Sequence, residues 1–399
     1  MAVGIITKLD TLKWSDASSS EVAVEVRSGI IAILFEASDV PQCATFSYGA
    51  DGTLTKLDEQ TLTGITYCGI VFSAIKIADG IVAFTYLSST PSPYAGEVAT
   101  VAIAADGTIT AAVIDVLEFD DDTYESNIVH ATGDIYVISF KEETANDAYI
   151  ATVDIDSSGN IGAAIADSQQ LTTGPTTAQS VIKIADGIVA IFYNATATGS
   201  RVETRSIAAD GTIGAIIDGP DIWLSSGTPY YMHSFSVGGT IYACTFQDAF
   251  SDGWVYTFDI SADGTITTAG VDSLEYEPTA SWRFPRGAAG GGIACFSYSD
   301  TNHYGQFKTV AIDSLGNVGA SVIDTETFDG TFADYTYIVK ITNVLYIVVW
   351  KDTNGYGQAA SLRVAANLGE GAGAYFVVGE YWGYYDGYGN RRLVKGVIG

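Results

Sequence analysis

Basic residues are scarce in this chain. Lysine and arginine together number 18 against 47 aspartates and glutamates, which gives a formal net charge of −29 over 399 residues. Contact with nucleic-acid phosphates requires a basic surface, so the composition excludes nucleic acid as a partner. It predicts an acidic, solvated surface that keeps the protein in solution.

Residues that bind metals or form disulfides are also few. The chain has 3 histidines, and its 4 cysteines (Cys43, Cys68, Cys244 and Cys295) stand singly among apolar residues with no Cys-x-x-Cys pair. A zinc site is not expected, and the thiols should be free and buried because cysteine behaves as a small hydrophobe. The segment 154–161 has the spacing of a calcium-loop start, but it lacks the completing glutamate. We expect neither a metal nor a cofactor.

Long apolar runs and helical patterns are missing as well. No segment has 18 uninterrupted apolar residues, so no membrane span is expected. No window sustains a 3.6-residue apolar period, and we therefore expect almost no helix. The first residues lack the parts of a signal peptide. Either the numbering is that of a mature form, or the protein is synthesised in the cytoplasm without a signal peptide.

A repeat of about 52 residues runs through the sequence. Its clearest marker is a small-residue turn such as Ala105-Asp106-Gly107-Thr108, and successive turn glycines lie 55, 52, 52, 53 and 52 residues apart. A fixed period of this length predicts a solenoid, a propeller or another array.

Each repeat reads as four short strands. In the second repeat, runs rich in Val, Ile, Tyr and Thr cover 70–76, 81–86, 97–103 and 109–119. Turn residues separate the runs, and Asp-Gly favours tight hairpins because glycine adopts positive φ without strain. The units are therefore four-stranded antiparallel sheets.

The number of units and their closure follow from the ends of the chain. The second run of each unit ends on an aromatic residue, in seven copies: Phe35, Tyr86, Phe140, Tyr193, Phe246, Tyr298 and Trp350. The last unit lacks its fourth strand, whereas residues 4–14 match the fourth strand of the other units. We predict an all-β, seven-bladed β-propeller over residues 1–366, closed by the N-terminal strand. An open solenoid would instead need polar capping repeats, which are absent.

The last residues differ from the repeats. Residues 367–399 are rich in glycine and tyrosine, carry seven aromatics between 375 and 388, and end on a basic stretch. An exposed apolar segment of this kind is typical of an interface. We predict a C-terminal extension that serves association or anchoring, the alternative being a tail that covers one blade edge.

Variable loops on one face should carry function, because loops on a rigid scaffold usually do. The densest group of chemically useful side chains belongs to repeats five to seven. Aromatics with Arg, Asp and His can stack on and hydrogen-bond to a sugar, although the same aromatics could pack the blade tops. A pair of catalytic carboxylates is not singled out. The predicted ligand-binding residues are Trp282, Arg283, Arg286, Tyr230, Tyr231, His233, Asp300, His303, Tyr304, Asp352 and Tyr356.

Two of these loops share an aromatic-x-Asp-x-Asn-x-Tyr-Gly pattern, at 298–305 and 350–357. The pattern resembles the repeat of propeller-type proteins from bacteriophage and environmental viral tails. The resemblance implies a role at a virion or extracellular surface, with other virion or surface proteins held through 367–399 and a homo-oligomer as an option.

Three functions remain open on the sequence alone. The first is a non-enzymatic propeller that binds a host glycan or protein receptor. The second is a polysaccharide-degrading enzyme on the same face, and the third is a structural coat module docked through its C-terminal extension. Propeller architecture alone does not choose among them.

Overall fold

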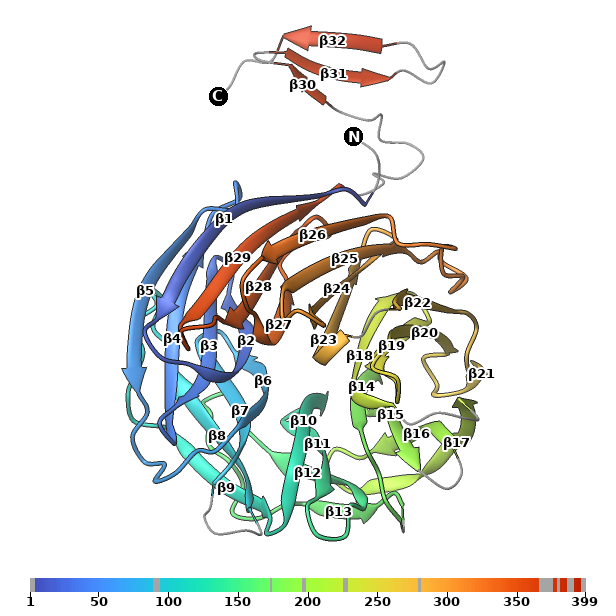
Figure 1. Ribbon diagram of the computed structural model, residues 1–399. Coiled ribbons are helices and arrows are strands. Elements are labelled where there is room, and N and C mark those ends of the chain that lie inside the picture. Colours follow the sequence, from blue (N-terminus) through green and yellow to red (C-terminus); the bar gives the residue numbers. More distant parts are fainter. Residues whose placement is uncertain are drawn as a thin grey trace.

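The computed structural model describes residues 4–88, 94–172, 174–195, 199–224, 229–278 and 281–365, together with three short strands nearer the C-terminus. For 281–284 only the backbone is described. Seven antiparallel sheets follow one another in a ring (Figure 1). No helix occurs among these residues, so this part of the chain contains no helix that could span a membrane. The predicted seven-bladed, all-β propeller is confirmed.

Each blade runs from an inner to an outer strand in chain order. The first four blades are β2 (Ser19–Arg27), β3 (Ile30–Ala37), β4 (Val40–Tyr48), β5 (Leu54–Thr61); β6 (Val71–Ala78), β7 (Ile81–Leu87), β8 (Gly96–Ala102), β9 (Asp115–Asp120); β10 (Thr123–Thr132), β11 (Ile135–Glu142), β12 (Ala148–Asp154), β13 (Asp167–Gln170); and β14 (Gln179–Ala185), β15 (Ile188–Ala195), β16 (Gly199–Ile207), β17 (Ile213–Leu224).

The remaining blades have the same order, except that the outer strand of blade five is split and that of blade seven comes from the N-terminus. They are β18 (Tyr230–Gly238), β19 (Ile241–Gln247), β20 (Gly253–Ile260), β21 (Ile266–Thr268), β22 (Ser273–Glu277); β23 (Ser281–Gly290), β24 (Ile293–Asp300), β25 (Gly305–Ala311), β26 (Asp324–Asp329); and β27 (Asp334–Lys340), β28 (Leu345–Lys351), β29 (Gly357–Val364), β1 (Ile6–Ser15).

The N-terminal strand closes the ring, as predicted. β1 pairs antiparallel with β29, from Ile6 opposite Val364 to Ser15 opposite Gly357. In Figure 1 the dark blue strand β1 lies beside the orange-red strand β29 in this blade. Trp14 is fully buried there, and its ring meets that of Phe35 in blade one edge-on, with 4.8 Å between centroids. The seam between the last and first blades is therefore packed like the others.

The hydrophobic core lies between blades. The seven aromatics that end the second strands are all at most 2% exposed. One cluster joins Val22 and Leu34 of blade one to Val82, Phe84 and Val101 of blade two, and comparable clusters lie between other blades. Burial of this surface is the main stabilising term, and it depends on neighbouring blades being present. The four cysteines are buried and free, as predicted.

Two polar contacts recur at every blade junction. An aspartate in each outer strand, or directly before it, accepts the main-chain N–H of the second residue after the turn glycine of the next blade, at 2.7–2.9 Å. A hydroxyl of each third strand donates to the carbonyl of that turn's glycine, at 2.5–2.6 Å. The carboxylates belong to Asp10, Asp58, Asp115, Asp167, Asp218, Asp272 and Asp324, and the hydroxyls to Thr45, Thr100, Thr152, Thr204, Thr257, Thr309 and Ser361.

The repeated turn has this sequence because of these contacts. Its glycine has φ between 84° and 94° at every junction, a region that residues with a Cβ rarely adopt. The glycine carbonyl can then face the hydroxyl of the preceding blade. The sequence marker is thus the residue set that joins one blade to the next.

The predicted outer strand at 109–119 is wrong in its first half. Strand β9 begins only at Asp115, because the preceding segment bonds to blade one: Ile109 N–H donates to Asp58, and Val113 N–H to the Thr63 carbonyl. The inner strand of blade two begins at Val71, one residue later than predicted, whereas that of blade five begins within the expected loop. Tyr230 already pairs with Gln247 in blade five.

The C-terminal strands form a separate small sheet. Strand β31 (Tyr381–Tyr385) pairs with β30 (Phe376–Val378) and with β32 (Arg391–Lys395). The other residues of the extension, and all side chains of this sheet, lie outside the described part of the chain. Association through 367–399 stays a prediction.

Candidate functional site

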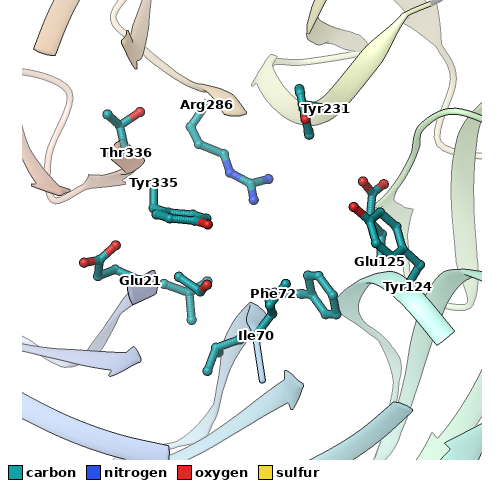
Figure 2. Close-up of a pocket in the computed structure, with 12 residues that line it drawn as sticks. Glu21, Ile70, Phe72, Tyr124, Glu125, Tyr231, Arg286, Tyr335 and Thr336 are labelled. Carbon is teal, nitrogen blue, oxygen red and sulfur yellow. The ribbon is translucent and has the colours of Figure 1, made fainter. Parts of the chain in front are cut away.

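A pocket of about 160 Å³ lies where the inner strands begin. It is lined by the first residues of β2, β6, β10 and β27, by Tyr231 of β18, and by Arg286 of β23 (Figure 2). Antiparallel pairing places these strand starts at the same end of each blade as the loops between second and third strands. The pocket therefore opens on the face with variable loops, at the centre of the ring.

Arg286 is the charged group that points into the pocket in Figure 2. Its Nε is buried without a hydrogen-bond partner, and its Cζ lies 5.3 Å from the centroid of the Tyr337 ring. Burial lowers the pKa of Arg286, while Tyr337 and Glu125 favour the charged form. Arginine remains protonated in proteins, so the pocket contains a cation with an unused donor.

Glu125 provides a carboxylate on the opposite wall. Burial raises its pKa, and the nearby charges of Lys141 and Arg286 act in the other direction. The residue is half-buried and lines both this pocket and a smaller adjoining chamber. It is therefore accessible from the cavity, and two basic side chains favour its ionised form against the effect of burial.

Glu21 is a second carboxyl group in the wall, on β2. It is 3% exposed, and its Oε1 accepts a 2.5 Å hydrogen bond from the Ser18 hydroxyl, whereas Oε2 has no partner. Burial raises its pKa from 4.5 to about 8, opposed by Ser18 and Lys351 and assisted by Asp334. Glu21 is thus mostly protonated at neutral pH, in contrast to an exposed glutamate.

The adjoining chamber has a volume of about 50 Å³ and a polar wall. Gln179 is 7% exposed and Ser126 is 8% exposed, and the amide atoms of Gln179 and the hydroxyl of Ser126 have no partner. The side-chain oxygen of Asn127 is also buried and unpartnered. Buried polar groups normally find partners, so these atoms indicate bound water or a polar ligand group.

Aromatic rings form the remaining wall, and the amino group of a lysine lies over the face of two of these rings. The Lys141 Nζ lies 4.6 Å from the Tyr124 ring centroid, and the Lys351 Nζ lies 5.3 Å from that of Tyr335. These distances are within the range of cation–π attraction. Tyr124 is 43% exposed, so part of its ring remains available to a ligand.

The structure brings two of the predicted site residues into the pocket, Tyr231 and Arg286, with two others close by. His233 accepts the Gly287 N–H at Nδ1 over 3.2 Å, and burial with the Arg286 charge lowers its pKa to about 3. It is therefore a neutral structural acceptor. Tyr230 is 38% exposed, and its ring centroid lies 6.4 Å from that of Tyr231.

Trp282 and Arg283 were predicted to lie in a loop, but they belong to β23, where Trp282 pairs with Ser299. Their side chains lie outside the described residues, so their role stays a prediction.

The other five predicted residues lie on the loops after β24 and β28 and do not line the pocket or its side chamber. Asp300 accepts the N–H groups of Asn302 and Tyr304 at 2.8 and 3.0 Å, and Asp352 does the same within its own loop. Their shared sequence pattern thus forms a loop with its own internal hydrogen bonds.

The remaining three are aromatic. The His303 ring stacks on Phe332, with 5.1 Å between centroids. Tyr304 is 37% exposed, and the Lys13 Nζ lies 3.3 Å above the Tyr356 ring. Ligand binding by these three residues stays a prediction.

Sequence reasoning missed Glu21 and Glu125. A signal was present: both are carboxylates at the start of inner strands, where other repeats carry apolar or amide residues such as Phe72 and Gln179. A charge at such a position is expensive unless it serves a purpose.

Comparison with known proteins supports the architecture. No family model matches the chain, and a search of curated proteins finds no match. Among solved structures, the periplasmic gluconolactonase of Pseudomonas aeruginosa is 12% identical, with 81% of this chain and 97% of that one covered and a TM-score of 0.51. The α-L-arabinanase of Penicillium chrysogenum is 10% identical, with 90% and 99% covered and the same TM-score.

A protein from Lactobacillus plantarum is 14% identical, with 76% and 83% covered, also at 0.51. At these identities the similarity concerns the fold alone. The comparisons give no support to the viral tail relationship that the two loop motifs suggested.

Proposed function

We propose that the central pocket is the active site of an enzyme that hydrolyses the terminal sugar of a saccharide. The supporting observation is that two glutamates, an arginine and several tyrosines from different blades line one cavity. A pocket with convergent polar groups and perturbed carboxyl groups is the first place to expect chemistry.

The size of the pocket favours a single ring. A cavity of about 150 Å³ is known to admit a benzene molecule, and this one has about 160 Å³. A six-membered sugar ring has a similar diameter. The rest of a saccharide would extend over the variable loops, so cleavage would proceed from the chain end.

The two glutamates would divide the acid and base roles. Glycoside hydrolysis needs one protonated carboxyl group and one ionised carboxylate. Glu21, with a pKa of about 8, would donate its proton to the glycosidic oxygen as the C–O bond breaks. On binding, Glu21 would exchange its contact with Ser18 for the substrate, since such hydrogen bonds often tighten only in the complex.

Glu125 would act as the base on a water molecule in the side chamber. The chamber has about 50 Å³, more than one water occupies in the liquid, and Glu125 is part of its wall. The water oxygen would attack the anomeric carbon while its proton passes to Glu125. The base thus receives one proton and the acid loses one, and proton exchange with solvent restores both.

A panel of 4-nitrophenyl glycosides tests this function. We expect release of nitrophenol from at least one of them. The Glu125→Gln variant should turn over that glycoside more slowly by a factor of about 10² to 10⁴, as is typical of a lost general base. Glu118→Gln, an exposed carboxylate on β9, is the matched control and should retain full activity. Equal rates in the wild type and Glu125→Gln would contradict the assignment.

Non-enzymatic sugar binding is the second candidate, and the aromatic wall favours it. Saturation binding of a saccharide without product after prolonged incubation would support that alternative instead.

A further inference from the structure

The distribution of cations around the pocket is unusual for this chain. Only 18 basic residues occur in 399, yet Arg286 lines this cavity and two lysines, Lys141 and Lys351, lie against tyrosines of its wall. In Figure 2 Arg286 points into the cavity. Lys141 and Lys351 lie over the rings of Tyr124 and Tyr335, two tyrosines of its wall. With 18 basic against 47 acidic residues, basic side chains are not expected to be concentrated at the centre of the ring by chance.

The carboxyl groups nearby do not cancel this charge. Glu125 interacts with Arg286 and Lys141, Glu36 interacts with Lys351, and Glu21 is mostly neutral at pH 7. Glu21 and Glu125 are the carboxyl groups that line the pocket, and burial disfavours the charged form of both, whereas Arg286 stays protonated although the molecule as a whole carries −29. Charges on the outer surface are screened over about 10 Å at 0.1 M salt, so the local cations dominate at contact distance.

An unused donor points to the kind of ligand. The buried Nε of Arg286 has no partner, and no carboxylate lies within ion-pair distance of this guanidinium among the described residues. A guanidinium binds planar oxyanions through paired, charge-assisted hydrogen bonds. A neutral sugar would leave the cation without such a partner in a largely enclosed space.

We propose that the central pocket selects an anionic sugar. Arg286 would hold the oxyanion of the sugar, and the sugar ring would pack against the tyrosines of the wall. This inference rests on the proposed function, because it names the substrate class of the same pocket. A uronic acid carboxylate and a sugar sulfate ester offer the same oxyanion chemistry.

Equilibrium binding to the full chain tests the inference. Methyl glucuronide, glucose 6-sulfate and methyl glucoside are titrated in a calorimeter at 0.1 M salt. Hydrogen bonds to a charged group contribute about 1.5–3 kcal/mol. At least one anionic sugar should therefore bind about 10-fold to 100-fold more tightly than the glucoside. The stronger of the two anionic ligands identifies the oxyanion.

Variants of the arginine complete the experiment. Arg286→Gln should bring the affinity ratio of anionic to neutral sugar close to one, and Arg286→Lys should retain part of it. Arg363→Gln on the exposed side of β29 changes the net charge equally and should keep the ratio. Thermal melts of all three exclude variants that fail to fold.

Each outcome is decisive. Equal affinities for anionic and neutral sugars, binding of none of the three, or an unchanged ratio in Arg286→Gln would overturn the inference. Hydrolysis of neutral glycosides without any preference for uronides would overturn it and leave the proposed hydrolase in place. Tight binding of an anionic sugar with no turnover of any glycoside would remove the hydrolase and keep the charge selection.

Discussion

Glu21 shows how much a single buried group can determine. It lies in the wall of the pocket, and its carboxyl group is held by Ser18 in a site where burial disfavours the charge. In the unfolded chain the same group ionises near pH 4.5. Between pH 4.5 and 8 the folded state therefore binds a proton that the unfolded state releases, and the free energy of unfolding falls as pH rises through this window.

Replacing Glu21 by glutamine should remove that dependence. Relative to the wild type, Glu21→Gln should gain stability by up to about 1.4 kcal/mol per pH unit between pH 4.5 and 8. Urea denaturation at several pH values measures the difference. The exposed Glu118→Gln variant should follow the wild type. Parallel curves for Glu21→Gln and the wild type would mean that Glu21 is ionised in the folded protein.

Individual site residues were only partly predictable. Arg286 and Tyr231 could be found from the sequence because basic and aromatic residues are conspicuous near a repeat boundary. Glu21 and Glu125 were missed among 47 acidic residues, although both stand at the start of inner strands where other repeats carry apolar or amide side chains. Asp300 and Asp352 were predicted to bind a ligand, but their carboxylates accept hydrogen bonds from N–H groups of their own loops. Accessibility and hydrogen-bond partners are properties of the fold, and the repeat alone does not reveal them.

The strands themselves were predictable to a greater degree. The closing aromatic of each second run located the second strand of every blade, and the run at 97–103 located the third strand of blade two. The outer strands were misplaced where main-chain groups bond to the neighbouring blade, as Ile109 and Val113 do. Local propensity carries no information about such contacts between blades.

The threonine of a third strand should contribute measurably to a junction. Thr152 is fully buried, and its hydroxyl donates to the Gly211 carbonyl of the next blade at 2.6 Å. Thr152→Val keeps the shape and leaves that carbonyl without its partner, so we expect a loss of about 1–3 kcal/mol. Differential scanning calorimetry would measure the lower melting temperature. Thr55→Val on exposed β5 is the control, and an equally small shift in both variants would contradict the expected role.

Closure of the ring concerns the molecule as a whole. Seven junctions with the same two polar contacts leave no blade without a neighbour on either side, and the contact of Ile6 with Asp324 belongs to this set. Because the core lies between blades, an open ring would expose apolar surface and unpaired strand edges.

Deletion of residues 1–15 should therefore destabilise the entire ring. The edge of β29 and the Trp14 site against Phe35 would be exposed, so we expect aggregation or a melting temperature lower by many degrees. Light scattering and thermal melts measure both. A truncation after Ala366, which leaves every described blade complete, is the comparison and should retain the melting temperature. An unaltered, monomeric protein lacking residues 1–15 would show that closure contributes little.

The pairing of β1 with β29 also means that the ring has no structural beginning. Ile6 stands opposite Val364 at the position where other blades have a tight turn between their last two strands. Joining these two positions by such a turn would restore an ordinary hairpin, and new termini could then be opened at an equivalent turn, for example at Gly159. The same sheet order would result from such a circularly permuted chain, because each blade junction uses the same two polar contacts.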